Sequence, residues 1–266
     1  MPKDLRAGQE IYWQVLGEGT RRAVAIHCSL AHSGAWKGVA EELRGTLAIT
    51  AFDLPGHGQS ADWDGREDFV ALTAQIAASF MDGPVDLIGH SVGGVAALQL
   101  AFAVPEMVRT LTLIEPVLFA AARGFPEWDE HLAEMAAYQR ALETGDRSAA
   151  AREFTRVWGT GVEWESLSPR SRSYTEERIH LISAGNPANV DDAGGILQPG
   201  ALESLSVPVM LIRGENSPSI IWRISEEIAA RLPDVGVADV QGAGHMLPIT
   251  HPSQVAGLIE VNLSRG

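Results

Sequence analysis

Short apolar runs alternate with helix-length amphipathic segments over most of the 266-residue chain. The apolar runs are Ala23–His27, Leu47–Phe52, Val85–Ile88, Leu111–Ile114, Val207–Ile212 and Val235–Val240. Between them lie amphipathic stretches such as Ser33–Leu43, Phe69–Phe80 and Val95–Ala103. Buried strands that alternate with helices specify a mostly parallel sheet with helices on both faces. The pattern therefore predicts the α/β fold class, and Leu5–Leu16, with Gly8 near its middle, predicts a preceding antiparallel hairpin.

The alternation stops between about Val117 and Gly200, where the pattern is helical throughout. The predicted helices here are Glu127–Leu142, Arg147–Trp158 and Tyr174–Ser183, and the strand–helix pattern resumes after Leu205. We therefore predict a core domain over residues 1–116 and 201–266, with a helical cap, or lid, over residues 117–200 inserted after the sixth strand. Because open α/β sheets bind ligands at the carboxyl ends of their strands, the cap is expected to cover that edge.

The net charge and the number of cysteines indicate which binding partners and which cellular compartment to expect. The chain has 34 acidic and 20 basic residues, a net charge of −14, which repels nucleic acid and anionic membranes, so we expect neither as a partner. Cys28 is the single cysteine, which excludes an internal disulfide and fits a reducing compartment. No apolar stretch reaches the length of about eighteen residues that a membrane span needs, and no signal peptide is evident. These features predict a cytoplasmic protein and leave a homodimer open.

The segment Gly89-His90-Ser91-Val92-Gly93 follows the apolar run Val85–Ile88 and opens a helical segment. Such a G-x-S-x-G pattern between a strand and a helix is typical of a nucleophile elbow, whose strained turn projects the serine hydroxyl above the sheet. The hydroxyl then lies at the positive end of the following helix. An ordinary glycine-rich turn is the alternative, but the strand–turn–helix context favours Ser91 as a covalent nucleophile.

A glycine-rich turn after the last predicted strand carries the candidate general base. Gly242-Ala243-Gly244-His245-Met246 follows Val235–Val240, which suits the chain order serine, acid, histidine. His251 is the nearest rival, with capping of the final helix as its alternative role. His27 and His57 lie near strand ends and are interpreted as structural. We predict that His245 is the base.

An oxyanion hole needs two backbone N–H donors aimed at the developing negative charge. The amide of Val92, directly after the nucleophile, is one candidate. The second is expected from the loop after the first parallel strand, where Ser29 and Leu30 both remain candidates. Cys28, in the same loop, is interpreted as a small buried residue rather than a reactive thiol.

One further motif makes a family resemblance specific. Phe52-Asp53-Leu54-Pro55-Gly56-His57-Gly58-Gln59-Ser60 matches the loop after the fourth strand of α/β-hydrolases. With the elbow, the histidine turn and the helical insertion, the chain resembles that superfamily over nearly its whole length. The resemblance implies an eight-stranded, mostly parallel sheet flanked by helices, a cap domain, and a Ser-His-acid triad with no cofactor. The Cys28-Ser29-Leu30 loop also resembles its counterpart in enol-lactone hydrolases.

The chain departs from the family pattern at the acid. The family usually places the acid three residues after the glycine that closes the seventh strand, and here Gly214 is followed by Glu215, Asn216 and Ser217. A serine cannot orient an imidazole as a carboxylate does. Glu115 ends the sixth strand, where certain haloalkane dehalogenases carry a carboxylate, and we predict it as the acid. The alternatives are Glu215, Asn216, a cap aspartate (Asp191 or Asp192), or a triad without an acid.

Aromatic residues in and near the insertion suggest an apolar acyl or alkyl pocket. The predicted lining residues are Trp36, Trp158, Trp164 and Met246, although packing within the cap itself is the alternative for several of the aromatics. No His/Asp/Glu cluster has metal-ligand spacing and no phosphate-binding glycine loop occurs, so we expect neither metal nor cofactor.

The sequence therefore predicts a serine hydrolase that cleaves a small or medium apolar ester, lactone or thioester through a Ser-His-Glu triad and an acyl-enzyme. Three alternatives remain. The same triad can hydrolyse C–C bonds or act as a cofactor-free perhydrolase. The serine at position 217 also permits a non-catalytic ligand-binding receptor on the same scaffold.

Overall fold

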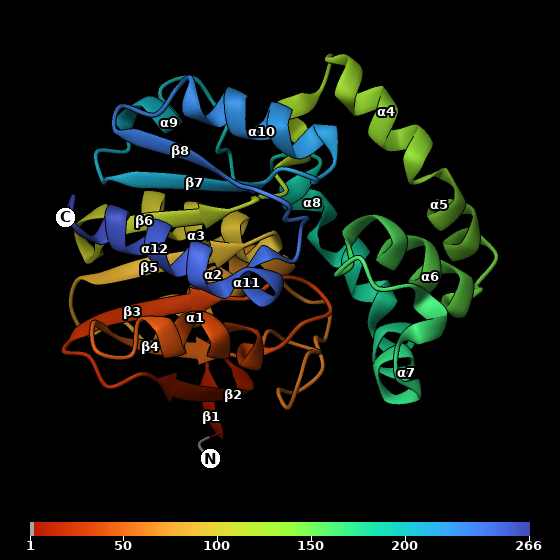
Figure 1. Cartoon of the computed structure of the whole chain (residues 1–266), viewed down its shortest axis with the longest axis horizontal. Helices are drawn as coiled ribbons and strands as arrows, with labels where there is room; N and C mark the ends of the chain where they lie inside the picture. The colour runs from red at the N-terminus through yellow and green to blue at the C-terminus, as the bar shows by residue number, and fades with distance from the viewer. Residues whose placement is uncertain (1–2) are drawn as a thin grey trace.

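The computed structural model describes residues 3–266 and contains one eight-stranded sheet (Figure 1). Its strands are β1 (Lys3–Arg6), β2 (Gln9–Leu16), β3 (Arg21–Ile26), β4 (Leu47–Phe52), β5 (Val85–His90), β6 (Val108–Ile114), β7 (Val209–Gly214) and β8 (Val235–Val240). Their order is β1-β2-β4-β3-β5-β6-β7-β8. The β1/β2 and β2/β4 pairs are antiparallel and the others are parallel, which confirms the predicted fold class and the N-terminal hairpin.

Helices cover both faces of the sheet because successive strand residues point to opposite sides. Ala23 and Ala25 of β3 pack on the side of α1 (Lys37–Glu42), α11 (Leu247–Thr250) and α12 (Pro252–Leu263). Val24 and Ile26 pack on the side of α2 (Phe69–Ala78), α3 (Val92–Ala103) and α10 (Ser219–Ala229). The central strand β5 is buried at every residue, as a parallel strand covered on both faces should be.

The chain between β6 and β7 is helical, and its helices α4 to α7 lie to the right of the sheet in Figure 1. Its elements are η3 (Phe119–Ala122), α4 (Pro126–Glu134), α5 (Ala136–Glu143), α6 (Arg147–Trp158), η4 (Trp164–Ser166), α7 (Pro169–Arg178), η5 (Ile179–Gly185), α8 (Asn186–Asn189) and α9 (Ala201–Ser204). Within residues 3–266, no helix combines the length and apolar character that crossing a membrane requires.

Two helix predictions in this region were wrong in their bounds. The predicted helix Glu127–Leu142 is two helices, because the chain turns at Met135, whose side chain is buried. The predicted Tyr174–Ser183 helix starts earlier, at Pro169, where the hydroxyl of Ser168 caps it by accepting from the amide of Ser171. It ends at Arg178 and continues as a 3₁₀ turn.

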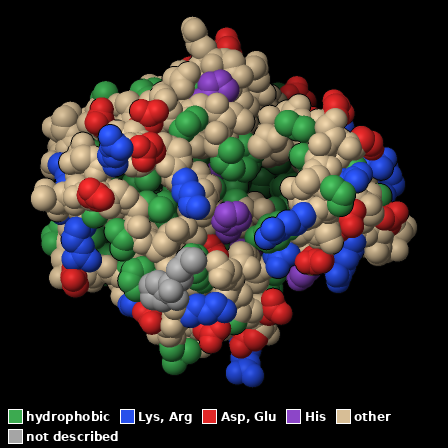
Figure 2. All heavy atoms as spheres, turned by 60° about the horizontal axis from the view of Figure 1, so that its bottom comes forward, with side chains coloured by type: hydrophobic (Ala, Val, Ile, Leu, Met, Phe, Trp, Pro, Cys, Tyr) green, Lys and Arg blue, Asp and Glu red, His purple; other side chains and the backbone are tan. Residues whose placement is uncertain are grey.

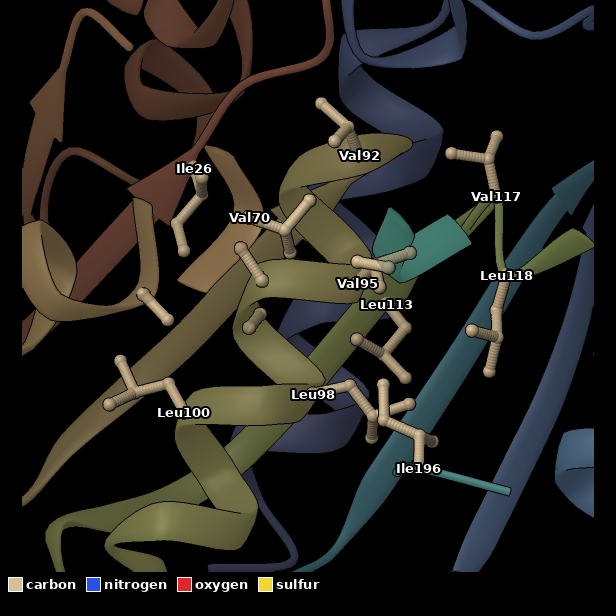
Figure 3. Close-up of a cluster of buried hydrophobic side chains, with 14 of the residues drawn as sticks. Ile26, Val70, Val92, Val95, Leu98, Leu100, Leu113, Val117, Leu118 and Ile196 are labelled. Atoms are coloured by element: carbon tan, nitrogen blue, oxygen red, sulfur yellow. The ribbon is translucent and has the colours of Figure 1, made fainter. Parts of the chain in front are cut away.

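The start and end of this helical segment pack directly on the core. Figure 3 shows Val117, Leu118 and Ile196 beside Leu98 of α3 and Leu113 of β6. All five side chains are buried in one hydrophobic cluster. This packing anchors both ends of the segment against α3 and β6 of the core.

Candidate active site

Ser91 occupies the sharp turn between β5 and α3, with φ 58° and ψ −122°. A side chain rarely adopts this left-handed φ, which is the strain expected of a nucleophile elbow. The turn is tight: a Cβ atom on Gly89 would meet the carbonyl oxygen of Gly93 at 2.3 Å, and one on Gly93 would meet that of Ile26 at 2.4 Å. Glycine at both positions is therefore required for the backbone to place Ser91 at the first turn of α3.

His245 follows β8 and lines the same cavity as Ser91. Its backbone carbonyl accepts a 2.8 Å hydrogen bond from Nε2 of His90, the residue before the serine, and the two imidazole rings lie 5.0 Å apart. Burial and the neighbouring His245 hold the pKa of His90 well below its usual value, so His90 is a neutral donor. The elbow thus holds the turn that carries the predicted base.

Glu115 follows β6, has a positive φ of 45° and is fully buried. One carboxylate oxygen, Oε2, lies 2.6 Å from Nδ1 of His245. The other, Oε1, accepts hydrogen bonds from the amide of Gly214 and the hydroxyl of Ser217, each at 2.5 Å. A buried carboxylate needs such donors, because an unpaired charge in the interior is strongly unfavourable. The structure therefore brings the predicted acid to the predicted base.

The rival acids make contacts elsewhere. The carboxylate of Glu215 accepts from the amide of Gly242 at 2.8 Å. Asp191 pairs with Arg123 at 2.9 Å. Asp192 accepts from two backbone amides of its own loop, at 2.9 Å each.

The rival histidines likewise have local partners. Nδ1 of His251 meets the hydroxyl of the adjacent Thr250 at 2.8 Å. His27 accepts from the amide of Leu54 through Nε2, and Nδ1 of His57 donates to the carbonyl of Pro55. These bonds fix the loops that flank the cavity and agree with the structural role predicted for His27 and His57.

The candidate oxyanion donors lie around the cavity. Val92 and Ser29 line it, while Leu30 lies on the wall of an adjoining groove and has a positive φ of 63°. The hydroxyl of Tyr174, from α7, donates to the carbonyl of Ala31 at 2.9 Å and so ties this loop to the helical segment. Cys28 is buried and faces Met246, with 3.8 Å between the sulfur atoms, and burial raises the pKa of its thiol to about 12.

The cavity above Ser91 has a volume of about 240 Å³ and a mostly apolar wall. Trp158 and Met246 line it, as predicted, and the ring of Trp158 meets that of His245 edge-on at 4.7 Å. Figure 2 shows a hollow on one face of the molecule with hydrophobic side chains inside it and Lys and Arg side chains near its edge.

Two predicted lining residues are corrected by the structure. Trp36 is 1% exposed and packs with α1 against one face of the sheet, and Trp164 is buried in the core of the helical segment. Neither belongs to the cavity wall that the described residues form. Both lie at one end of a short 3₁₀ helix, where an aromatic side chain can point to either side and only the tertiary packing decides which.

Helices α4 and α5 also contribute to the cavity wall, a contribution that was not predicted from the sequence. Residues from these helices recur there at helical spacing, namely Trp128, His131, Leu132, Met135, Tyr138 and Gln139. That three-to-four-residue period is typical of a helix face and continues across the turn at Met135, so the signal was present. Within residues 3–266, no group of three or more His, Cys, Asp and Glu side chains is arranged to hold a metal ion.

Comparison with known proteins places these features in context. The model of the alpha/beta hydrolase family matches residues 23–258. The chain is 36% identical over 250 residues to a pimeloyl-[acyl-carrier protein] methyl ester esterase of Salmonella newport (strain SL254), covering 92% of this chain and 94% of that protein. It is 26% identical over 235 residues to the protein of the same name from Nitrosomonas europaea, covering 87% and 91%. A solved alpha/beta hydrolase from Sphaerobacter thermophilus superposes with a TM-score of 0.71 at 19% identity, over 97% of this chain and 99% of that one, which shows a shared fold.

Proposed function

The chain belongs to the alpha/beta hydrolase family, and we propose that it is a serine carboxylesterase with a Ser91-His245-Glu115 catalytic triad. The observation that carries the proposal is the 2.6 Å hydrogen bond between the buried Glu115 and Nδ1 of His245, which lines the same cavity as the strained Ser91. The curated relatives are named as ester-cleaving enzymes, which supports the same class of reaction here.

The mechanism follows from the roles that these groups have in a triad. The Ser91 oxygen attacks the ester carbonyl carbon while His245 accepts the hydroxyl proton through Nε2. The amide of Val92 and that of Ser29 or Leu30 stabilise the tetrahedral oxyanion. The C–O bond then breaks, His245 protonates the leaving alkoxide, and an acyl-enzyme remains. Water attacks this acyl group with His245 again as base, and releases the carboxylic acid and free Ser91.

Glu115 suits the role of the acid because of what surrounds it. Its Oε1 accepts from the hydroxyl of Ser217, the position at which the family usually carries the acid, and its Oε2 meets His245. The carboxylate thus occupies the space beside position 217 although it comes from another strand. It fixes the tautomer of His245 and stabilises the imidazolium that forms during proton transfer. A non-catalytic receptor was an alternative because position 217 carries no carboxylate. Glu115 supplies a carboxylate beside His245, so position 217 no longer argues against catalysis.

The cavity favours a small or medium apolar acyl group. Its volume of about 240 Å³ lies below the ~300–1,000 Å³ typical of drug-sized ligand sites, and aromatic and aliphatic side chains dominate its wall. The curated relatives are methyl ester esterases by name, which favours an ester with a small alcohol over a lactone or thioester.

A fluorophosphonate probe tests the proposal directly. Intact-mass analysis should show one adduct on the wild-type protein and none on Ser91→Ala, which should also lose hydrolysis of p-nitrophenyl esters. Ser29→Ala is the matched control, because Ser29 lines the same cavity but is expected to contribute only its backbone amide. Labelling that persists in Ser91→Ala, or disappears in Ser29→Ala alone, would show that the nucleophile is misassigned.

A further inference from the structure

The loop that carries the second candidate oxyanion donor is a tight turn at residues 28–31. The amide of Ala31 donates to the carbonyl of Cys28 at 3.3 Å and closes the turn. Leu30, its third residue, has a φ of 63°, a conformation that such turns usually give to glycine or asparagine. A residue with a side chain keeps this conformation only where the surrounding structure holds it. The direction of the amides of Ser29 and Leu30 therefore depends on what holds the two ends of the turn.

The core domain holds the first end of the turn through His27. Its Nε2 accepts a hydrogen bond from the amide of Leu54 at 3.0 Å, so the proton of the neutral ring is on Nδ1. Nδ1 donates to the carbonyl of Cys28 at 2.7 Å. Burial holds the pKa of His27 well below its usual value, which keeps the ring neutral.

The helical segment holds the second end of the turn through Tyr174 of α7. The amide of Gly58 can only donate, and it does so to the Tyr174 hydroxyl at 2.9 Å. The single proton of the hydroxyl is therefore free for the carbonyl of Ala31, also at 2.9 Å. Burial raises the pKa of Tyr174 above its usual value, so the hydroxyl keeps this proton at pH 7. A donor that itself accepts a hydrogen bond is polarised, which strengthens the bond that it donates.

The hydroxyl of Tyr174 is itself held in place. The guanidinium of Arg178 lies over the Tyr174 ring, 3.9 Å from its centroid, and Nε of Arg178 donates to the carbonyl of Gly56 at 3.1 Å. Gly56 belongs to the loop after β4, which the core fixes in turn: the amide of Gln59 donates to the carboxylate of Asp53 at 2.8 Å. A group that is anchored in this way can hold a strained turn beside it.

We propose that Tyr174 is a positioning residue that holds the oxyanion-hole turn at residues 28–31 in its catalytic conformation. The inference rests on the proposed esterase function and adds a residue of the helical segment to the parts that the reaction needs. Tyr174 does not line the cavity that the described residues form around Ser91, so it acts through the backbone of the turn. Without its hydroxyl, Leu30 can relax to a negative φ, which turns the donor amide away from the oxyanion.

Tyr174→Phe tests the proposal, because it keeps the aromatic ring and removes only the hydroxyl. Its kcat on a p-nitrophenyl ester should fall by about 10- to 100-fold, somewhat less than the ~10²–10³ that complete removal of an oxyanion donor costs. KM should stay within about threefold, because binding of the ground state does not use the oxyanion hole. Expressing kcat per Ser91 labelled by a fluorophosphonate, measured by intact mass, prevents a fraction of unfolded protein from mimicking the loss.

Two inhibitors distinguish positioning of the oxyanion hole from a purely structural role. A trifluoromethyl ketone adds to Ser91 and forms a tetrahedral oxyanion that resembles the transition state, whereas the methyl ketone of the same chain binds as the substrate does. In Tyr174→Phe the Ki of the trifluoromethyl ketone should rise by the factor by which kcat/KM falls. The Ki of the methyl ketone should stay within about threefold of the wild-type value.

Glu127→Ala is the matched control. The carboxylate of Glu127, on α4, pairs with Arg223 of α10 at 3.1 Å, so it also joins the helical segment to the core, but at a different helix from α7. This variant should leave kcat, KM and both Ki values within about threefold of wild type, as a surface substitution away from a site usually does. If Tyr174→Phe does not fold, Arg178→Met replaces it, because it frees the Tyr174 ring, and the same pattern with a smaller factor is expected.

Three results would overturn this inference and leave the esterase function intact, provided that the wild-type protein hydrolyses esters and is labelled at Ser91. The first is a kcat per labelled site that Tyr174→Phe leaves unchanged. The second is a fall in kcat without a matching rise in the Ki of the trifluoromethyl ketone. The third is an equal loss of kcat in Glu127→Ala, which would assign the effect to docking of the whole helical segment. No hydrolysis of any ester by the wild type, together with no labelling of Ser91, would overturn both proposals.

Discussion

The carboxylate of Glu115 and Nδ1 of His245 lie 2.6 Å apart although 130 positions separate them in the chain. Glu115 follows β6, which lies in the sheet between β5, the strand that leads to Ser91, and β7, the strand that leads to Ser217. The positive φ of Glu115, rare for a residue with a side chain, turns the backbone away from the strand. The amide of Gly214 and the hydroxyl of Ser217 then hold the second carboxylate oxygen. Glu115 follows β6, one strand away from the family's usual acid position after β7, and its carboxylate still reaches His245.

Replacing Glu115 by Gln should lower kcat by about 10⁴-fold, because the amide favours the wrong tautomer of His245 and cannot stabilise the imidazolium. KM should change little, since Glu115 does not line the cavity that the described residues form. Steady-state kinetics on a p-nitrophenyl ester measure both parameters, and circular dichroism checks that the fold is retained.

Glu215→Gln is the control for that experiment. Glu215 follows the same strand as Ser217 and also accepts a backbone hydrogen bond, from Gly242, but it does not meet His245 in the described structure. Its kcat should stay within about threefold of wild type, since a surface substitution away from the site usually changes little. A larger loss in Glu215→Gln than in Glu115→Gln would assign the acid to Glu215 instead.

Substitutions of Trp158 and Trp164 can be compared directly. Both are buried tryptophans of the helical segment, but of the two only Trp158 lines the cavity. Trp158→Ala should enlarge the cavity and shift the preference among plain acyl esters toward longer chains. Trp164→Ala should destabilise the protein by about 3–5 kcal/mol, the usual cost of truncating a buried tryptophan, without reordering the ester preference. Thermal unfolding and a chain-length series measure the two effects. A reordered preference in Trp164→Ala would show that the segment's own core shapes the cavity.

Three buried histidines, His27, His57 and His90, and the partly buried His131 predict how stability depends on pH. Burial lowers the pKa of His57 and of His131 to about 4, and those of His27 and His90 well below their usual value. In the unfolded chain a histidine takes up a proton near pH 6.5, at about its ordinary pKa. Between about pH 6.5 and 4 the unfolded state therefore binds more protons than the folded one, so the free energy of unfolding falls as pH falls.

Urea unfolding between pH 7.5 and 5 measures this slope above the range in which most carboxylates titrate. Near pH 5, the His131→Phe variant should take up about one proton fewer on unfolding than the wild type. Its free energy of unfolding should therefore change less steeply with pH, by about 1.4 kcal/mol per pH unit. Stability that stays constant down to pH 5 would contradict the neutral, buried state of these rings.

The strands β3 to β7 were predictable from the sequence because most of their residues are buried. The run Leu47–Phe52 coincides with β4, whereas β5 extends two residues beyond the predicted end, to His90. Gly89 and His90 do not resemble strand residues, and their place in β5 depends on the neighbouring strands with which they pair. The break at Met135 in the helical segment likewise depends on packing and has no signal in the local pattern.

The sequence located the residues of the site better than it located the cavity wall. Ser91 and His245 stand in motifs with a fixed place in the fold, and Glu115 could be inferred from the missing acid at position 217. Their catalytic roles remain predictions. The direction of an aromatic side chain such as that of Trp36 depends on contacts with distant segments, which local spacing does not encode.

Ser217→Asp combined with Glu115→Ala tests whether the acid can be supplied from the family's usual position. The hydroxyl of Ser217 lies 2.5 Å from Oε1 of Glu115, so an aspartate there can occupy the space that Glu115→Ala vacates. The double variant should recover at least tenfold in kcat over Glu115→Ala, because a carboxylate again orients His245. Ser217→Asp alone should lose stability and activity, because two carboxylates would share one buried site and could not both ionise. The four proteins form a double-mutant cycle, and kcat and Tm are measured for each. Equal kcat values for Glu115→Ala and the double variant would show that position 217 cannot serve His245, and that the Glu115 strand alone has the required geometry.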